Sequence, residues 1–198
     1  MKTALLLSGG MDSVSIARWQ KPDIAITVDY GQLPAEAEIV AAGKVAELLS
    51  IEHEVIRVDC SALGSGDMAG TAPSPAAPVS EWWPFRNQLV LTLAGMAAVR
   101  LGAVRLLIGT LATDGQHADG RPDFIERISG LMSMQEGGMV VEAPAIGLDA
   151  VQLVRQSGID QATLAWAHSC HTGNFACGRC RGCIKHFNTW KTLGWTPH

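Results

Sequence analysis

The chain has 198 residues, of which 47% are apolar and 17% charged, a composition that fits one globular domain and excludes an intrinsically disordered chain. The formal net charge of −4 disfavours general nucleic-acid binding, which needs a basic surface. The chain has no apolar run long enough to span a membrane and its apolar start is too short for a signal peptide, so we expect a cytoplasmic protein.

Short apolar runs alternate along the chain with longer segments of helical periodicity. We expect strands at residues 3–7, 24–28, 53–58, 105–109 and 139–143, and helices at 12–19, 35–49, 87–101, 123–134, 149–157 and 181–192. Apolar strands that alternate with helices indicate a parallel sheet covered on both faces. The sequence therefore predicts the α/β class: an open, doubly wound, parallel five-stranded sheet over residues 1–166, with the segment 167–198 packed on it as one unit.

The first expected strand runs into the sequence SGGMDS, residues 8–13. Ligands of open α/β sheets bind at the carboxyl ends of the strands, where this turn lies. Its glycines let backbone N–H groups approach an anion, and the next helix adds the positive end of its dipole. Asp12 repels phosphate, so we expect it to cap the helix or to act through Mg²⁺. The alternative is a plain strand-to-helix turn.

Three stretches interrupt or follow the expected elements. Residues 60–84 are rich in Gly, Pro, Ser and Ala and long for a structureless loop, which usually means a functional or mobile segment. WWPFRNQ brings Arg86 and Asn87 to the start of a helix, and DGQHADGRPDF places several polar residues after the fourth strand. Each of the last two alone is equally consistent with a helix cap or a surface acidic cluster.

Four of the five cysteines are close together near the end of the chain, with the spacing C-x6-C-x2-C-x2-C. Four thiolates complete a tetrahedral shell around Zn²⁺ and leave no open position for substrate, so we expect a structural zinc site. The expected ligands are Cys170, Cys177, Cys180 and Cys183. Cys60 stands apart as an ordinary thiol.

In order, the motifs SGGMDS, VDYGQ (28–32), PFRN (84–87), the stretch 114–124 and the cysteine tail resemble the 7-cyano-7-deazaguanine synthase family of PP-loop ATP pyrophosphatases. The resemblance covers almost the whole chain. It implies an ATP-dependent carbon–nitrogen ligase that converts 7-carboxy-7-deazaguanine to its nitrile with ammonia. It also implies Mg²⁺, Zn²⁺ and a homodimer.

The resemblance also implies roles for individual residues. The residues expected to bind ATP are Leu7, Ser8, Gly9, Gly10, Met11, Asp12, Ser13 and Val28. The residues expected to act in catalysis are Asp12, Ser13 and Arg86, and those expected to bind substrate are Arg86, Asn87, Asp114, Asp119 and Arg121. Trp82, Trp83 or Phe85 could stack on the flat heterocycle or belong to the core.

The chain departs from the family pattern around the substrate and the phosphates. Leu33 and Pro34 follow YGQ, residues 115–121 differ, and Ala150 stands where a lysine is expected near the phosphates. The final product is therefore open: the nitrile, its amide, or a conjugate with an amine of another molecule such as a protein. An inactive nucleotide-binding scaffold is a further alternative. So is a tRNA-thiolating enzyme, which would need Cys60 for catalysis and is disfavoured by the acidic charge balance.

Overall fold

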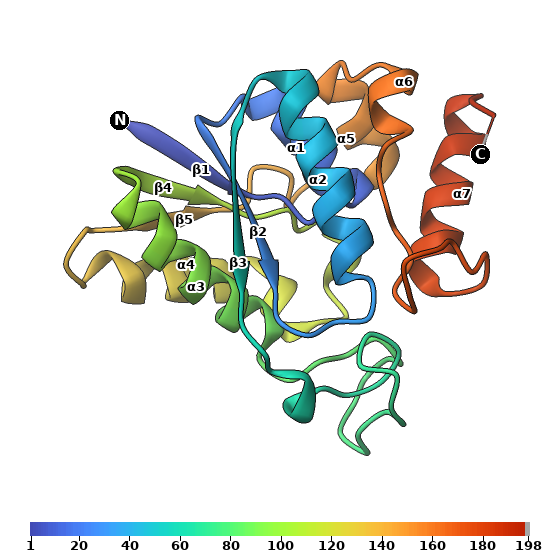
Figure 1. The fold of residues 1–198 in the computed structure, drawn as a ribbon, viewed down its shortest axis with the longest axis horizontal. Helices are drawn as coiled ribbons and strands as arrows, with labels where there is room; N and C mark the ends of the chain where they lie inside the picture. The colour runs from blue at the N-terminus through green and yellow to red at the C-terminus, as the bar shows by residue number, and fades with distance from the viewer. Residues whose placement is uncertain (197–198) are drawn as a thin grey trace.

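A single parallel sheet forms the centre of the computed structural model, which describes residues 1–196 (Figure 1). Its five strands lie in the order β3-β2-β1-β4-β5. Their bounds are β1 Lys2–Leu6, β2 Ile24–Asp29, β3 Glu52–Arg57, β4 Ala103–Leu107 and β5 Val140–Glu142. The α/β class and the doubly wound five-stranded sheet are confirmed. The last two residues of the expected segment 167–198 lie outside the described range.

Helices cover both faces of this sheet (Figure 1). On one face lie α3 Arg86–Arg100 and α4 Pro122–Ser133. On the other face lie α1 Met11–Gln20, α2 Ala35–Leu49, α5 Ala150–Ser157, the short α6 Gln161–Leu164 and the last helix, α7 Arg181–Leu193. Of the three inner strands, β1 and β2 are buried from both sides, which is why they are apolar at successive positions rather than at alternate ones.

The chain reverses its direction across the sheet beside β1. It builds β1, β2 and β3 toward one edge and then returns to add β4 and β5 on the other side of β1. The turns that follow β1 and β4 therefore lie next to each other at the carboxyl edge of the sheet. This is the position at which open α/β sheets bind their ligands.

The bounds expected from sequence agree with the structure to within two residues at each end. Helix α6 was not predicted: it has four residues and starts because the Asp160 carboxylate accepts a hydrogen bond from the Thr163 backbone N–H, 2.9 Å away. Three short 3₁₀ helices were also missed, at Ser61–Leu63, Ala112–Asp114 and Ala118–Gly120. Among the described residues, no helix is long and apolar enough to cross a membrane.

The segment 60–84 is held to the body of the protein by apolar contacts. Met68 and Trp83 are buried in the core on the α3 face. The Trp83 ring meets the Tyr30 ring edge-on, with 5.0 Å between centroids. The Met68 carbonyl accepts a hydrogen bond from the Leu33 N–H, 2.8 Å away. These contacts fix the position of the segment beyond the carboxyl end of β3 (Figure 1).

Gly9 has a specific packing reason to be glycine. Its φ is +73°, and a Cβ there would lie 2.6 Å from the carbonyl oxygen of Glu38 in α2. Gly102 has a similar φ of +78° with open space around it. We expect Gly9→Ala to lower the melting temperature more than Gly102→Ala, by the equivalent of about 1–3 kcal/mol. Both substitutions place alanine at a positive φ, but only the new methyl group at position 9 would clash with α2. Equal melting temperatures would contradict this account.

Candidate active site

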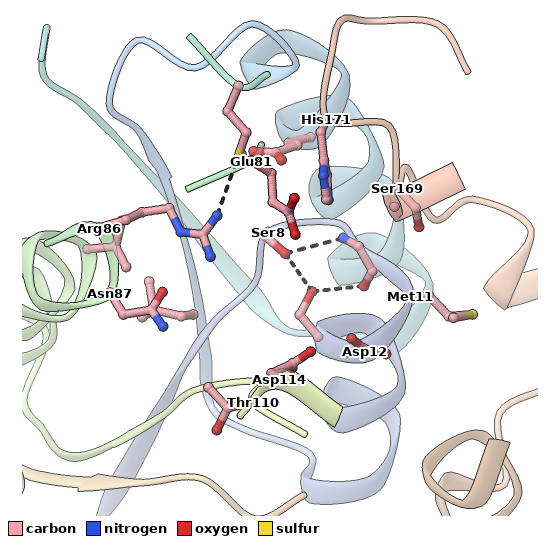
Figure 2. Close-up of a pocket in the computed structure, with 18 of the residues that line it drawn as sticks. Ser8, Met11, Asp12, Glu81, Arg86, Asn87, Thr110, Asp114, Ser169 and His171 are labelled. Atoms are coloured by element: carbon pink, nitrogen blue, oxygen red, sulfur yellow. Dashed lines mark hydrogen bonds between the residues drawn. The ribbon is translucent and has the colours of Figure 1, made fainter. Parts of the chain in front are cut away.

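A cavity of about 290 Å³ lies at the carboxyl edge of the sheet (Figure 2). Its wall combines the turn after β1, the ends of β2 and β4, and the start of α3 with the segment 60–84 and the C-terminal segment. In Figure 2, Arg86 from α3 and His171 from the C-terminal segment reach toward Ser8 from opposite sides. Segments far apart in the chain thus build one site over the SGGMDS turn.

The SGGMDS turn presents hydrogen-bond donors to this cavity. The Ser8 and Ser13 hydroxyl oxygens lie 3.2 Å apart, and the Ser13 hydroxyl donates to the Gly10 carbonyl at 3.0 Å. Helix α1 begins at Met11 with Gly10 as its N-cap and no side-chain cap. The first N–H groups of a helix have no partner within the helix, so they are available to an anion here.

Asp12 is not the helix cap that was one of its two expected roles. It lies inside α1, and its Oδ2 is 2.7 Å from the Lys185 Nζ of α7, while the Asp114 Oδ1 lies 3.7 Å from the same nitrogen. Burial raises the pKa of Asp12, and the charge and hydrogen bond of Lys185 oppose that rise.

Three polar atoms of the cavity residues are buried without a hydrogen-bond partner: His171 Nδ1 and two oxygen atoms. The two oxygen atoms are Asp12 Oδ1 and the Thr110 hydroxyl. Leaving a buried polar atom unpaired is costly. Both residues line the cavity together with Asp114, and oxygen atoms are the ligands that Mg²⁺ prefers. The donor set therefore fits a magnesium ion.

The start of α3 is organised by Asp119. The Asp119 Oδ2 accepts from the Asn87 backbone N–H at 3.2 Å, and the Asn87 side chain donates back to the Asp119 carbonyl at 2.9 Å. Asn87 and Arg86 thereby face the cavity, where an Arg86 nitrogen lies 3.1 Å from the Met68 sulfur. Asp119 positions these residues and does not line the cavity itself.

Most of the expected site residues come together in this cavity, and four lie elsewhere. Those that line it are Ser8, Gly10, Met11, Asp12, Ser13, Val28, Arg86, Asn87 and Asp114. Those outside it are Leu7, Gly9, Asp119 and Arg121.

Each of these four has a structural reason for its place. Leu7 is buried in the core on the α1 face, because successive extended residues point to opposite sides, and Leu6 lines the cavity instead. Gly9 faces α2. Arg121 donates to the Gly115 carbonyl at 2.9 Å in an exposed contact. Among the aromatic candidates, Trp83 is core and Phe85 is exposed.

Two carboxylates in the cavity were not anticipated from sequence. Glu38 accepts a hydrogen bond from the Gln32 side chain at 2.8 Å, and burial raises its pKa to about 7 despite the nearby Arg86. Glu81 is buried, with its Oε1 2.7 Å from an Arg181 nitrogen and 3.6 Å from the His117 Nε2. Burial would raise the Glu81 pKa, but the hydrogen bonds and the Arg181 charge lower it to about 2.

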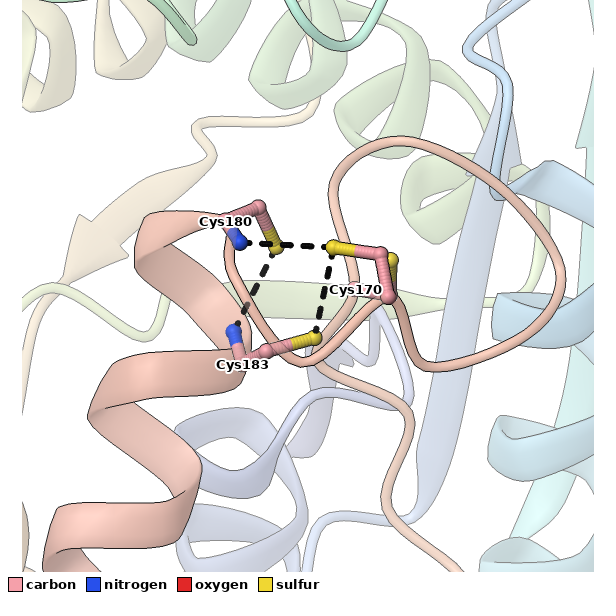
Figure 3. A group of neighbouring side chains, drawn as sticks. Cys170, Cys180 and Cys183 are labelled. Atoms are coloured by element: carbon pink, nitrogen blue, oxygen red, sulfur yellow. Dashed lines mark hydrogen bonds between the residues drawn. The ribbon is translucent and has the colours of Figure 1, made fainter.

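The four tail cysteines form one cluster (Figure 3). Their sulfur atoms all lie within 4.8 Å of one another. Two thiolates on one tetrahedral zinc ion at about 2.3 Å each lie about 3.8 Å apart, so small side-chain shifts would bring all four sulfur atoms onto a single ion. Burial and the neighbouring Cys180 and Cys170 sulfurs raise the pKa of Cys183 to about 12. Four thiolates therefore need a cation between them, and the donor set suits zinc.

The comparisons with known proteins agree with this architecture. A family model described as the queuosine biosynthesis protein QueC matches residues 2–194. The chain belongs to the QueC family. It is 30% identical to the 7-cyano-7-deazaguanine synthase of Methanosarcina barkeri over 98% of this chain and 95% of that protein. It is 33% identical to the synthase of the same name from Nitrosomonas eutropha over 92% of this chain and 89% of that protein.

A solved structure outside the QueC family shares the fold. The U34-tRNA thiolase NcsA from Methanococcus maripaludis, which carries a 4Fe-4S cluster, matches 98% of this chain with a TM-score of 0.53 and 15% sequence identity. This chain spans 65% of the thiolase chain. At that identity the likeness concerns the fold alone.

The Cys180 sulfur serves as a metal ligand candidate and as the N-cap of α7, because it accepts the Cys183 N–H. A serine hydroxyl is also a good N-cap. Cys180→Ser should therefore keep the cap but lose zinc, and lower the melting temperature by roughly 10 °C, because a structural metal supplies folding free energy. Metal analysis and calorimetry measure both, with Cys60→Ser as the control. Full zinc content and unchanged melting in Cys180→Ser would contradict the four-cysteine site.

The raised pKa of Glu38 predicts a pH dependence of stability. Between the usual value of 4.5 and about 7, the folded protein holds a proton that the unfolded chain has released, so stability falls as pH rises through this window. Glu38→Gln should lose less stability than the wild type between pH 5 and pH 8. Urea unfolding at each pH tests this, with the exposed Glu36→Gln as the matched control. Identical pH slopes in wild type and Glu38→Gln would contradict the assignment.

Proposed function

We propose that this protein activates 7-carboxy-7-deazaguanine with ATP and then lets an amine replace AMP. The names of the QueC-family relatives support this substrate class. The observation that carries the proposal is the uncapped start of α1, with the Ser8 and Ser13 hydroxyls, facing the same cavity as Arg86. That arrangement suits an anion on one side and a planar acid on the other.

The chemistry explains why such a site is needed. A carboxylate is a poor acylating agent because its oxygen leaves badly. A carboxylate oxygen attacks the α-phosphorus of ATP. The bond from this phosphorus to the oxygen that bridges to the β-phosphate then breaks, and pyrophosphate leaves. An amine nitrogen then forms a bond to the acyl carbon and loses a proton, the bond from that carbon to the phosphate oxygen breaks, and AMP leaves with that oxygen. With ammonia the product is the amide, and a second ATP would drive its dehydration to the nitrile.

The chain's own groups bind and orient the reactants in this scheme. The N–H groups of the SGGMDS turn and the Ser8 and Ser13 hydroxyls hold the leaving pyrophosphate. Arg86 pairs with a phosphate or with the substrate carboxylate as a planar double donor. Asp12 and Asp114 would hold Mg²⁺, which neutralises phosphate charge when bound. Positioning and charge stabilisation account for such catalysis without a protein nucleophile.

The recognition of the heterocycle falls to the cavity's acceptors. A guanine-like edge presents N–H donors, and carboxylates accept from such groups. Of the two aspartates expected for this role, Asp114 lines the cavity, whereas Asp119 caps α3. Glu38 and Glu81 are further acceptors in the same wall. Because Asp114 is proposed to hold Mg²⁺ with Asp12, we assign the edge of the deazaguanine to Glu38 and Glu81.

A second candidate is transfer of the activated acid to an amine of another molecule, such as a protein. Two observations favour it: residues 115–121 depart from the family pattern, and Ala150, in place of the expected lysine, begins helix α5 in a buried position. In either case we propose that the segment beginning at residue 167 works with the sheet as one unit, and the cavity residues that it supplies support this. The expected homodimer stays a prediction.

Incubation with ATP, Mg²⁺ and 7-carboxy-7-deazaguanine tests the proposal. We expect release of AMP and pyrophosphate that depends on the acid, and mass spectrometry separates nitrile, amide and conjugate. Asp12→Asn should keep the fold and the zinc content but lower the rate on the order of 100-fold, because it removes the charge of a proposed Mg²⁺ ligand at the phosphates. The exposed Asp123→Asn is the control. No acid-dependent AMP release by the wild type would exclude adenylation.

A further inference from the structure

We propose that Lys185 of α7 is the residue that binds the polyphosphate of the nucleotide, opposite the SGGMDS turn. The proposal rests on the proposed function, since it concerns the same nucleotide site. It gives the C-terminal segment a direct part in ligand binding, in addition to the structural role expected for its cysteine cluster.

The first step is to compare the arginine and lysine side chains that line the cavity, which are Arg86, Arg181 and Lys185. Arg181 is engaged by the buried Glu81 at 2.7 Å. Arg86 lies beside the Met68 sulfur, on the α3 side of the cavity. The Lys185 ammonium is the one in contact with the turn itself, 2.7 Å from the Asp12 Oδ2.

The second step is the charge balance around that ammonium. Lys185 lies near two carboxylates, Asp12 at 2.7 Å and Asp114 at 3.7 Å. A polyphosphate seated on the start of α1 would bring further negative charge next to Asp12. Mg²⁺ on Asp12 and Asp114 would offset part of this repulsion, and the Lys185 ammonium adds a positive charge that is present with or without the metal. The flexible four-carbon stem of a lysine lets its ammonium contact the carboxylate and a phosphate oxygen together.

The third step is how α7 is held against the turn. The His168 backbone N–H donates to the Gly9 carbonyl at 2.9 Å, which joins the C-terminal segment to the glycine turn. A Cβ on Gly182 would overlap the Ser169 carbonyl, so the first turn of α7 packs directly on the loop before it. The fully buried Trp190 anchors the other end of the helix in the core. Lys185 is thus carried by a fixed helix.

Direct binding measurements test this role. In calorimetric titrations with inorganic pyrophosphate, ATP and AMP, Lys185→Met should weaken pyrophosphate and ATP roughly tenfold or more, because it removes a charge-assisted contact. The affinity for AMP should stay within about twofold. Lys185→Arg should recover part of the loss. Lys191→Met, an exposed lysine of the same helix, should bind all three ligands as the wild type does.

A double variant separates a phosphate contact from simple neutralisation of Asp12. If Lys185 only screens Asp12, then Asp12→Asn combined with Lys185→Met should bind pyrophosphate as tightly as the wild type when both are titrated without added Mg²⁺. If Lys185 binds phosphate, the double variant should stay weak. Recovery in the double variant, wild-type affinity in Lys185→Met, or equal losses for AMP and pyrophosphate would each overturn the proposal. Failure of the wild type to bind ATP or pyrophosphate would overturn the proposed function as well.

Discussion

The parallel direction of all five strands is the constraint on which the rest of the molecule depends. Because the strands run the same way, the turns after β1, β2 and β4 open at one edge of the sheet, and the reversal of strand order beside β1 separates them enough to leave room between. Helices cover both faces of the sheet, so the polar groups that can bind a ligand next to the strands lie at this edge and not on a face. The cavity, with its serines, carboxylates and arginine, lies there as a result.

The sequence predicted the fold and half of the site because both depend on local patterns. Apolar runs such as IAITV, alternating with helical periodicity, require the parallel sheet, and a strand that ends in SGGMDS places that turn at the ligand edge. The cysteine spacing was equally local, and the four sulfurs do form one cluster. Each of these inferences needs only residues close together in the chain.

The other half of the site depends on pairs that no local pattern contains. The Asp12–Lys185 contact joins residues 173 positions apart, and the Glu81–Arg181 contact joins residues 100 apart. Asp119 was expected at the substrate because the family resemblance implied it. In the structure its carboxylate accepts a hydrogen bond from the Asn87 N–H in the first turn of α3. Leu7 was misplaced by one position, which in an extended segment is enough to turn a side chain from the cavity to the core.

Two parts of the cavity wall lie outside the sheet, and this affects how proteins with this fold can change the ligands they bind. The segment 60–84 and the C-terminal segment contribute Glu81, Met68 and Arg181 to the wall, yet neither adds a strand to the sheet. Substitutions there alter the outline and charge of the cavity while the pairing of strands and the glycine turn stay intact. Substitutions in the segment 60–84 can therefore change which ligands the cavity accepts, while the sheet and the SGGMDS turn are inherited unchanged.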